Sequence, residues 1–266
     1  MENFYFETKR ELKDEYIISK IAPHECPPHI HRQMEILYVL SGEYQASVNE
    51  ETAKLGKNQI AVADSFDVHK WQPIHATAFY IVIPYSALSS FIEQKNGKVL
   101  YSHFLLDNEV CLHIKSIAQA LQKCIATSQP LLVEGLTKVL LGLLLQNLRL
   151  VEKSKFNKNF LLHEILDYIE QNFMHDITLE SISKHFSYST YYFSRLFNET
   201  LGFHLDAYIN MIRTQNVLYL MKTKNSSVAD AVLNSGFSSL PTFYRYFKNR
   251  YKCSLTHYLK KEIKVD

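Results

Sequence analysis

Two similar segments of the sequence, 179-LESISKHFSYSTYYFSRLF-197 and 228-VADAVLNSGFSSLPTFYRYF-247, decide the fold. Each segment reads as a short helix, a tight turn and a second helix that carries the pattern F-x-R-x-F. Residues four apart lie on the same side of a helix, so both phenylalanines of each pattern should pack inward while Arg195 and Arg245 project outward. An apolar back and a polar, basic front are what a helix-turn-helix unit requires. The repeat therefore predicts two such units in tandem.

The tandem repeat and its charge favour nucleic acid as the partner. One copy alone would fit an amphipathic helical hairpin with a surface arginine equally well. Residues 183–266, however, contain 12 Lys and Arg against 5 Asp and Glu, whereas residues 1–156 contain 16 against 17. A basic surplus confined to one region is typical of a nucleic-acid-binding part joined to another part. Gly236 also falls where the second turn needs a positive φ.

Two longer stretches resemble the signature of the AraC/XylS transcription regulators: 188-YSTYYFSRLFNETLGFHLDAYINMIR-213 and 236-GFSSLPTFYRYFKNRYKCSLTHYLK-260. The resemblance covers about residues 160–260. It implies two helix-turn-helix units that are bridged by a long helix and address adjacent major-groove segments of double-stranded DNA. Carried over by position, it implies two sets of DNA contacts: Tyr191, Ser194 and Arg195 in the first unit, and Pro241, Thr242, Tyr244 and Arg245 in the second, with Lys248 and Arg250 nearer the phosphates. Each of the two central arginines could read a guanine or hold a phosphate.

The N-terminal part is rich in short β-like runs up to about residue 84, which predicts a sandwich or barrel. One run, 27-PPHIHRQMEILYVLSG-42, places His29, His31 and Glu35 close together, with Gly42 expected to close the strand. In the AraC/XylS family the N-terminal half is often a small cupin barrel, and this spacing is similar to the first cupin motif.

The second cupin motif is partly present in residues 56–69, which end at His69. Its usual proline and inner glycine are replaced by Asp64 and Phe66, so the turn before His69 should differ. Alternate residues of one strand face the same interior, and imidazole suits zinc, nickel, manganese or iron. The candidate metal ligands are therefore His29, His31, Glu35 and His69.

Three uses of this barrel stay open from the sequence: a divalent metal site, a metal-free pocket for a small-molecule effector such as a sugar, or a structural role. The candidate effector contacts are His29, His31, Glu35, His69, Tyr38 and Trp71. A divalent metal in the barrel is the one cofactor that the residues suggest.

The middle of the chain predicts two helices, over residues 110–126 and from 130 to about 153. The second is apolar on more than one side, so either its own domain or a second subunit must cover it. We expect these helices to form a homodimer contact. The predicted fold is α+β with two domains. We expect a cupin-like sensor barrel over 1–85, a helical dimerisation segment over 86–153, and a DNA-binding domain with two helix-turn-helix motifs over 160–262.

The sequence thus favours a sequence-specific transcription regulator that a small molecule controls. Activation, the commoner behaviour in the family, is the expected output, with RNA polymerase as a further partner. A cupin metalloenzyme fused to a DNA-binding domain is the alternative, and a protein-binding adaptor is a third. The chain shows no nucleophilic triad, phosphate-binding glycine loop or paired catalytic carboxylates, which argues against an enzyme. Four scattered cysteines, no secretion signal and polar residues within the most apolar stretch favour a cytoplasmic location without membrane contact.

Overall fold

The computed structural model describes residues 5–7, 14–21, 25–152, 158–202, 204–224 and 226–262. The contacts divide the chain into two compact units, one that runs to His163 and one that begins at Glu164. None of the helices in these ranges combines the length and the apolar character needed to cross a bilayer.

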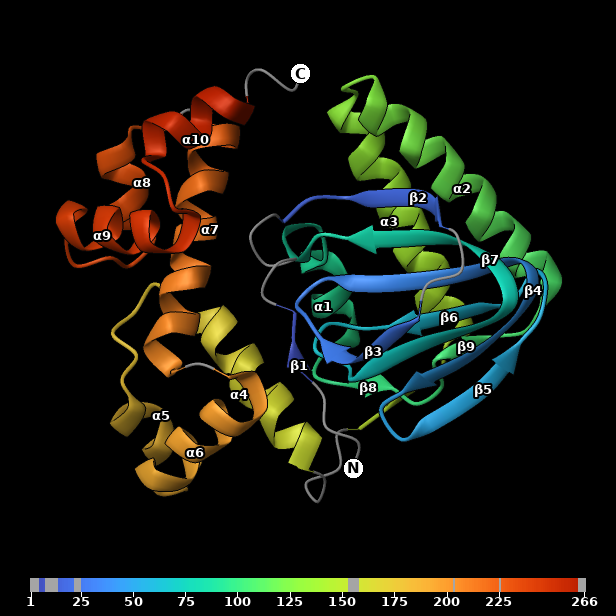
Figure 1. The fold of residues 1–266 in the computed structure, drawn as a ribbon, viewed down its shortest axis with the longest axis horizontal. Helices are drawn as coiled ribbons and strands as arrows, with labels where there is room; N and C mark the ends of the chain where they lie inside the picture. The colour runs from blue at the N-terminus through green and yellow to red at the C-terminus, as the bar shows by residue number, and fades with distance from the viewer. Residues whose placement is uncertain are drawn as a thin grey trace. The chain divides into compact units, whose positions relative to one another are not determined.

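The first unit is built on one eight-stranded sheet in which every pairing is antiparallel except that of β1 with β3. Two long strands, β4 and β7, pair along most of their length and form its centre (Figure 1). The strands of this sheet are β1 (Tyr5–Phe6), β2 (Ile17–Ile21), β3 (Cys26–Ile30), β4 (Met34–Val48), β5 (Glu51–Leu55), β6 (Ile60–Ala63), β7 (His69–Ile83) and β9 (Phe104–Leu105).

Gly42 lies inside strand β4 and does not close it, so the expectation from the sequence is wrong. The register of β4 against β7 shifts on both sides of Ser41, which marks a bulge, and the strand continues to Val48. Gly42 has φ +70°, and a Cβ there would lie 2.2 Å from the carbonyl oxygen of His75. The glycine therefore lets β4 bend while it stays paired.

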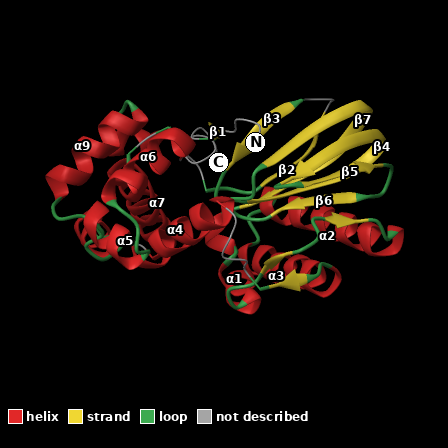
Figure 2. Cartoon of the chain, turned by 90° about the horizontal axis from the view of Figure 1, so that it is seen from below, coloured by secondary structure: helices red, strands yellow, loops and turns green. Residues whose placement is uncertain are grey.

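Strand alternation gives the sheet two apolar faces. Ile36 and Tyr38 lie in the core between the sheet and the helices. Leu37 and Val39 lie in a second core on the opposite face of the sheet. Figure 2 shows the helices of this unit along one side of the strands. The helical layer consists of the 3-10 turn η2 (Tyr85–Ala87) and the helices α1 (Ser89–Lys95), α2 (Asn108–Ala126) and α3 (Pro130–Asn147).

Helix α3 ends at Asn147, earlier than the expected end near residue 153. Leu148 adopts an extended backbone, and β10 (Leu150–Val151) then pairs with β8 (Val99–Leu100) as a separate two-stranded sheet. The inner side of α3 is buried, while Leu131, Leu132 and Val139 are 80, 52 and 52% exposed. An apolar outer side thus remains uncovered in the described part of this unit.

The second unit is helical and contains the two predicted helix-turn-helix pairs, α5–α6 and α8–α9. The long helix α7 runs between the two pairs (Figure 1). Helix α4 (Lys158–Asn172) crosses the boundary between the two units. The helices that follow are α5 (Leu179–His185), α6 (Thr190–Leu201), α7 (Leu205–Lys224), α8 (Val228–Asn234), α9 (Leu240–Tyr251) and α10 (Leu255–Glu262).

Side-chain caps set the starts of the short helices. Thr178 forms a capping box with Ser181, and the hydroxyls of Ser189 and Ser239 accept the N–H groups of Tyr192 and Thr242. These caps satisfy backbone donors that a helix leaves without an internal partner. They explain how helices of only seven to twelve residues begin at defined positions.

Candidate functional site

Helix α6 has the two-sided character that the sequence predicts. Phe193 and Phe197 are fully buried, and the opposite side presents Tyr191, which is 74% exposed, together with the exposed Arg195 and the half-buried Ser194. The Nε atom of Arg195 donates to Oε1 of Glu199 at 2.8 Å, and this hydrogen bond is the main reason why the pKa of Arg195 is raised.

Helix α9 repeats this arrangement with one difference at its end. Phe243 and Phe247 are buried, and the candidate contacts Pro241, Tyr244, Arg245 and Lys248 are exposed. Thr242 is half-buried and takes part in the cap, since its hydroxyl lies 2.9 Å from that of Ser239. Arg250 is also half-buried, and one Nη atom lies 3.8 Å from Sδ of Met211 on α7, so the structure does not bring it to the exposed side with Arg245.

The two helices therefore offer polar and basic side chains on rigid, buried phenylalanine anchors. Arginine and hydroxyl side chains projecting from the first turns of such a helix are the groups that read base edges or hold phosphates. The same side of each helix also carries an exposed tyrosine, which can pack on sugar or base.

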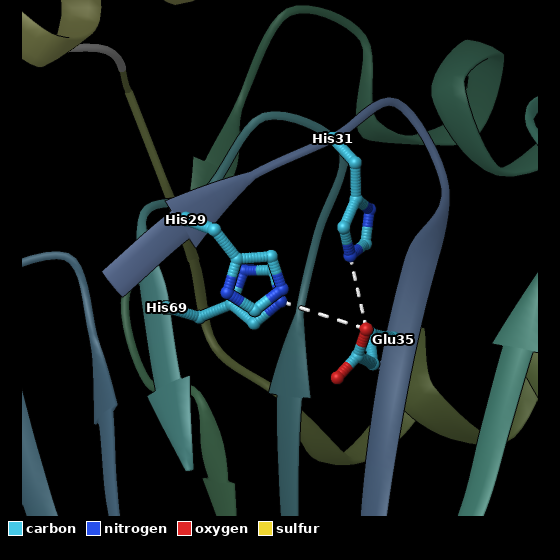
Figure 3. Close-up of side chains that lie close together, drawn as sticks. All are labelled: His29, His31, Glu35 and His69. Atoms are coloured by element: carbon cyan, nitrogen blue, oxygen red, sulfur yellow. Dashed lines mark hydrogen bonds and ion pairs between the residues drawn. The ribbon is translucent and has the colours of Figure 1, made fainter. Parts of the chain in front are cut away.

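The four candidate metal ligands of the first unit come together in space. His29 lies on β3, His31 just after it, Glu35 on β4 and His69 at the start of β7 (Figure 3). All four are buried, and their ligand atoms lie within 4.8 Å of one another. Oε2 of Glu35 lies 2.9 Å from Nε2 of His31 and 3.6 Å from Nε2 of His69.

Backbone carbonyl groups fix the orientation of all three imidazole rings. Each Nδ1 lies close to a carbonyl oxygen: His29 to Pro27 at 2.9 Å, His31 to Gln33 at 3.0 Å and His69 to Asp67 at 2.8 Å. A carbonyl oxygen only accepts, so each Nδ1 donates its proton and each neutral ring keeps a lone pair on Nε2. This is the arrangement that orients histidine ligands around a metal.

The atoms that face one another in the cluster are hydrogen-bond acceptors, with few protons available between them. Burial, followed by the nearby His69, lowers the pKa of His29 to about 3, so this ring is neutral near pH 7. The buried Nε2 of His69 has no hydrogen-bond partner among the described residues. With Nδ1 as the donor to Gln33, Nε2 of His31 and Oε2 of an ionised Glu35 are both acceptors, so their short contact needs a proton on one of the two atoms or a cation between them. The residues present therefore fit a divalent ion.

The structure separates the two aromatic candidates for effector contact. Trp71 belongs to the cluster, because its Nε1 donates to Oε1 of Glu35 and its ring centroid lies 5.2 Å from that of His69. Tyr38 lies on the opposite face of the sheet, in the core beneath the helices, where its hydroxyl donates to Asn58. Residues 35 and 38 point to opposite sides of the same strand, so Tyr38 does not reach the cluster.

Two residues near the cluster were missed from the sequence. Tyr5 stacks on His29 with ring centroids 5.7 Å apart, and Oε2 of Glu7 lies 3.8 Å from His29 Nε2. They are placed by the parallel pairing of β1 with β3, which brings Tyr5 opposite His29. No motif or residue spacing in the sequence predicts such a pairing between two short strands.

The turn before His69 holds the cluster in place. Phe66 takes the left-handed backbone, φ +66°, that the replaced glycine would adopt without strain, and its N–H donates to the carbonyl of His31. Asp67 accepts from the side chain of Asn49 and from the backbone N–H of Asp64. The turn thus differs from the usual motif in its residues and is fastened to the neighbouring strands.

Comparison with known proteins agrees with this division of the chain. The family described as "Helix-turn-helix domain" matches residues 182–261, and the family described as "Cupin domain" matches residues 17–82. The protein is therefore of the class in which a cupin domain is followed by a helix-turn-helix domain. The multiple antibiotic resistance protein MarA of Salmonella typhimurium is 32% identical over 88 residues, which cover 33% of this chain and 69% of MarA. The chain belongs to the AraC family of helix-turn-helix transcription regulators, with an N-terminal cupin domain.

Other relatives match smaller shares of their length or lie further away. Several uncharacterized HTH-type transcriptional regulators of Staphylococcus aureus are 29% identical over 104 residues, 39% of this chain, and the match spans 13% of their length. The AraC-like transcriptional activator CuxR is 13% identical with a TM-score of 0.47, over 77% of this chain and 72% of CuxR. A structure of ToxT from Vibrio cholerae with bound unsaturated fatty acid is 11% identical with a TM-score of 0.40, over 92 and 94%. The family is one of transcription regulators and not of enzymes.

Proposed function

We propose that the protein is a sequence-specific, double-stranded-DNA-binding transcription regulator that acts in the cytoplasm. The observation that carries this proposal is the pair of helices α6 and α9, each anchored by two buried phenylalanines and each exposing an arginine on the opposite side. Two such helices on one compact unit suit adjacent major-groove segments of one duplex. The proposed contacts are Tyr191, Ser194, Arg195, Pro241, Thr242, Tyr244, Arg245 and Lys248, with Arg250 supporting α9 from behind.

A salt titration tests this function directly. DNA selected from a random pool by the full-length protein is bound at a series of salt concentrations, and the slope of log affinity against log salt is measured. Each phosphate neutralised contributes about −0.9 to that slope. We expect a slope of several units and a marked preference for the selected site. A slope near zero, or equal affinity for random and selected DNA at every salt concentration, would falsify the proposal.

The signal, we propose, enters through a divalent transition-metal ion held by His29, His31, Glu35 and His69. The convergent lone pairs and the carbonyl-fixed Nδ1 atoms support this use over a metal-free organic pocket. Tyr38 faces the other side of the sheet, and Trp71 is only 2% exposed with its ring against His69, so neither offers an open ring face to a sugar. The bound ion would join β3, β4 and β7 at one point. The regulated output we propose is activation, through contact with RNA polymerase.

Metal binding and its effect on DNA are measured separately. Isothermal titration of the full-length protein with zinc, nickel, manganese or iron(II) should give one site per chain for at least one ion. His31→Ala should abolish that binding, while His113→Ala, an exposed histidine on α2, should not. Adding the ion should then change DNA affinity by about 5- to 150-fold, the usual range of such coupling. Metal binding that leaves both DNA affinity and transcription unchanged would remove the sensor role.

A further inference from the structure

The two DNA-facing arginines differ in what surrounds them. Arg195 on α6 is paired with Glu199, four residues later, through a 2.8 Å contact between Nε and Oε1. Arg245 on α9 has Asn249 at the same offset. Throughout the described part of the chain, Arg245 makes no ion pair or side-chain hydrogen bond. One guanidinium is therefore held, and the other is not.

Helix stability does not explain the Arg195–Glu199 pair. Both side chains are more than 60% exposed, at 61 and 62%, and exposed pairs of this spacing contribute little. The order is also the weaker one, because a carboxylate favours the position N-terminal to its cation. Glu199 lies in the last turn of α6, where the helix dipole disfavours a negative charge. On a DNA-facing helix, this carboxylate would in addition repel phosphates.

The atoms used in the pair suggest its role. A guanidinium has five N–H donors in a planar fork. Arg195 gives Nε to Glu199 and also has a side-chain hydrogen bond to Tyr191, so the donors that remain for DNA lie on the two Nη atoms. Two of these donors can reach O6 and N7 of a guanine together. Arginine otherwise loses much rotamer freedom when it binds, and a partner that already fixes the plane reduces this loss.

Resting on the proposed DNA-binding function, we propose that Glu199 is a positioning residue. It holds Arg195 by Nε so that the Nη edge of the guanidinium reads a guanine in the major groove. Arg245, which no carboxylate among the described residues holds, supplies charge and adapts to its site. The first helix-turn-helix unit therefore discriminates more sharply at its arginine than the second.

Variants of Glu199 in the full-length protein test this role. The readout is the ratio of affinities for selected DNA and for the same DNA with the guanine replaced, measured at one salt concentration. We expect Glu199→Ala to reduce this ratio by about tenfold, which corresponds to roughly 1.4 kcal/mol. Glu199→Gln keeps an acceptor for Nε, so it should give a smaller reduction. Glu180→Ala removes an exposed carboxylate from α5 and should leave the ratio unchanged.

The opposite outcome is equally distinct. If Glu199 only repels phosphates, Glu199→Ala should raise affinity for every sequence by the same factor and leave the ratio intact, which overturns the inference. In an Arg195→Ala background, Glu199→Ala should have no further effect on the ratio, as expected for a residue that acts through another. Absence of salt-dependent DNA binding by the wild-type protein would instead refute the proposed function. Thermal unfolding of each variant checks that the fold is kept.

Discussion

The indole Nε1 of Trp71 donates a hydrogen bond to Oε1 of Glu35, and this bond decides which oxygen of Glu35 faces the histidines. Oε2 is left to approach Nε2 of His31 and Nε2 of His69. Trp71 thus orients a metal-ligand candidate from behind, as carbonyl oxygens orient the imidazole rings.

Replacing the indole should therefore weaken metal binding without removing a ligand. We expect Trp71→Phe to lower the affinity for the ion by about 10- to 100-fold, because Glu35 loses the donor that fixes its plane. Isothermal titration measures this. Tyr44→Phe is the matched control, since the buried Tyr44 hydroxyl lies in the same interior core and has no hydrogen-bond partner in the described residues. Equal affinity in Trp71→Phe and Tyr44→Phe would show that Trp71 only fills space.

The metal-free cupin domain should lose stability in acid because of His29. Its pKa is about 3 in the folded protein and about 6.5 in an unfolded chain, so the unfolded state binds more protons between these values. The free energy of unfolding therefore keeps its full value above pH 6.5. It falls as the pH drops toward 3, by up to roughly 1.4 kcal/mol per pH unit.

Urea unfolding in a chelator, followed by fluorescence, measures this loss. The single tryptophan of the chain lies in the cupin domain and reports that domain alone. His29→Gln should flatten the pH dependence, whereas His113→Gln, at an exposed position, should not. An unchanged slope in His29→Gln would assign the acid sensitivity to other groups.

Gly236 should be far less replaceable than Gly202, although both have a positive φ. A Cβ at Gly236 would lie 2.8 Å from backbone atoms of Met174, whereas one at Gly202 meets nothing within 4 Å. We expect Gly202→Ala to cost about 1 kcal/mol of unfolding free energy from backbone strain alone. Gly236→Ala should cost roughly 1–3 kcal/mol more, since the two backbones must move apart.

Circular dichroism in urea detects this difference in the helical unit. Tryptophan fluorescence should stay unchanged in both variants, because Trp71 lies in the other unit. Equal destabilisation by the two alanines would mean that the turn around Gly236 shifts freely.

Local patterns made much of the fold predictable. The inward phenylalanines of α6 and α9 depend on residues four positions apart, and all four are confirmed as buried. The His29, His31 and Glu35 cluster follows from strand alternation over a few residues, and the gathering of these side chains with His69 is observed.

Features that depend on distant pairing were not predictable in the same way. Glu7 reaches His29 only because β1 pairs with β3, and a two-residue strand has no periodicity to detect. Gly42 looked like a strand end, but the bulge beside it is defined by the partner strand β7. Tyr38 is an aromatic residue close in sequence to Glu35, but its position three residues later on β4 turns it to the opposite face of the sheet, away from Trp71.

Arg195 and Arg245 should give different results when each is replaced by alanine. We expect Arg195→Ala to lose roughly 1–3 kcal/mol of discrimination at one base pair, as for a bidentate contact to guanine. Arg245→Ala should weaken all sequences by a similar factor and reduce the salt slope by about one. Competition binding against a panel of singly substituted sites separates the two patterns. A uniform loss in both variants would reduce both arginines to phosphate contacts.

The uncovered outer side of α3 should hold two copies of the chain together. Leu131 and Val139 are 80 and 52% exposed, and each leucine or valine that a partner covers contributes about 1.5–3 kcal/mol. We expect the wild-type protein to sediment as a homodimer and Leu131→Glu with Val139→Glu to sediment as a monomer. Leu106→Glu is the control, since Leu106 is 56% exposed in the same unit but lies outside α2 and α3. A double variant that still sediments as a dimer would place the contact elsewhere. A monomeric wild-type protein would contradict the homodimer itself.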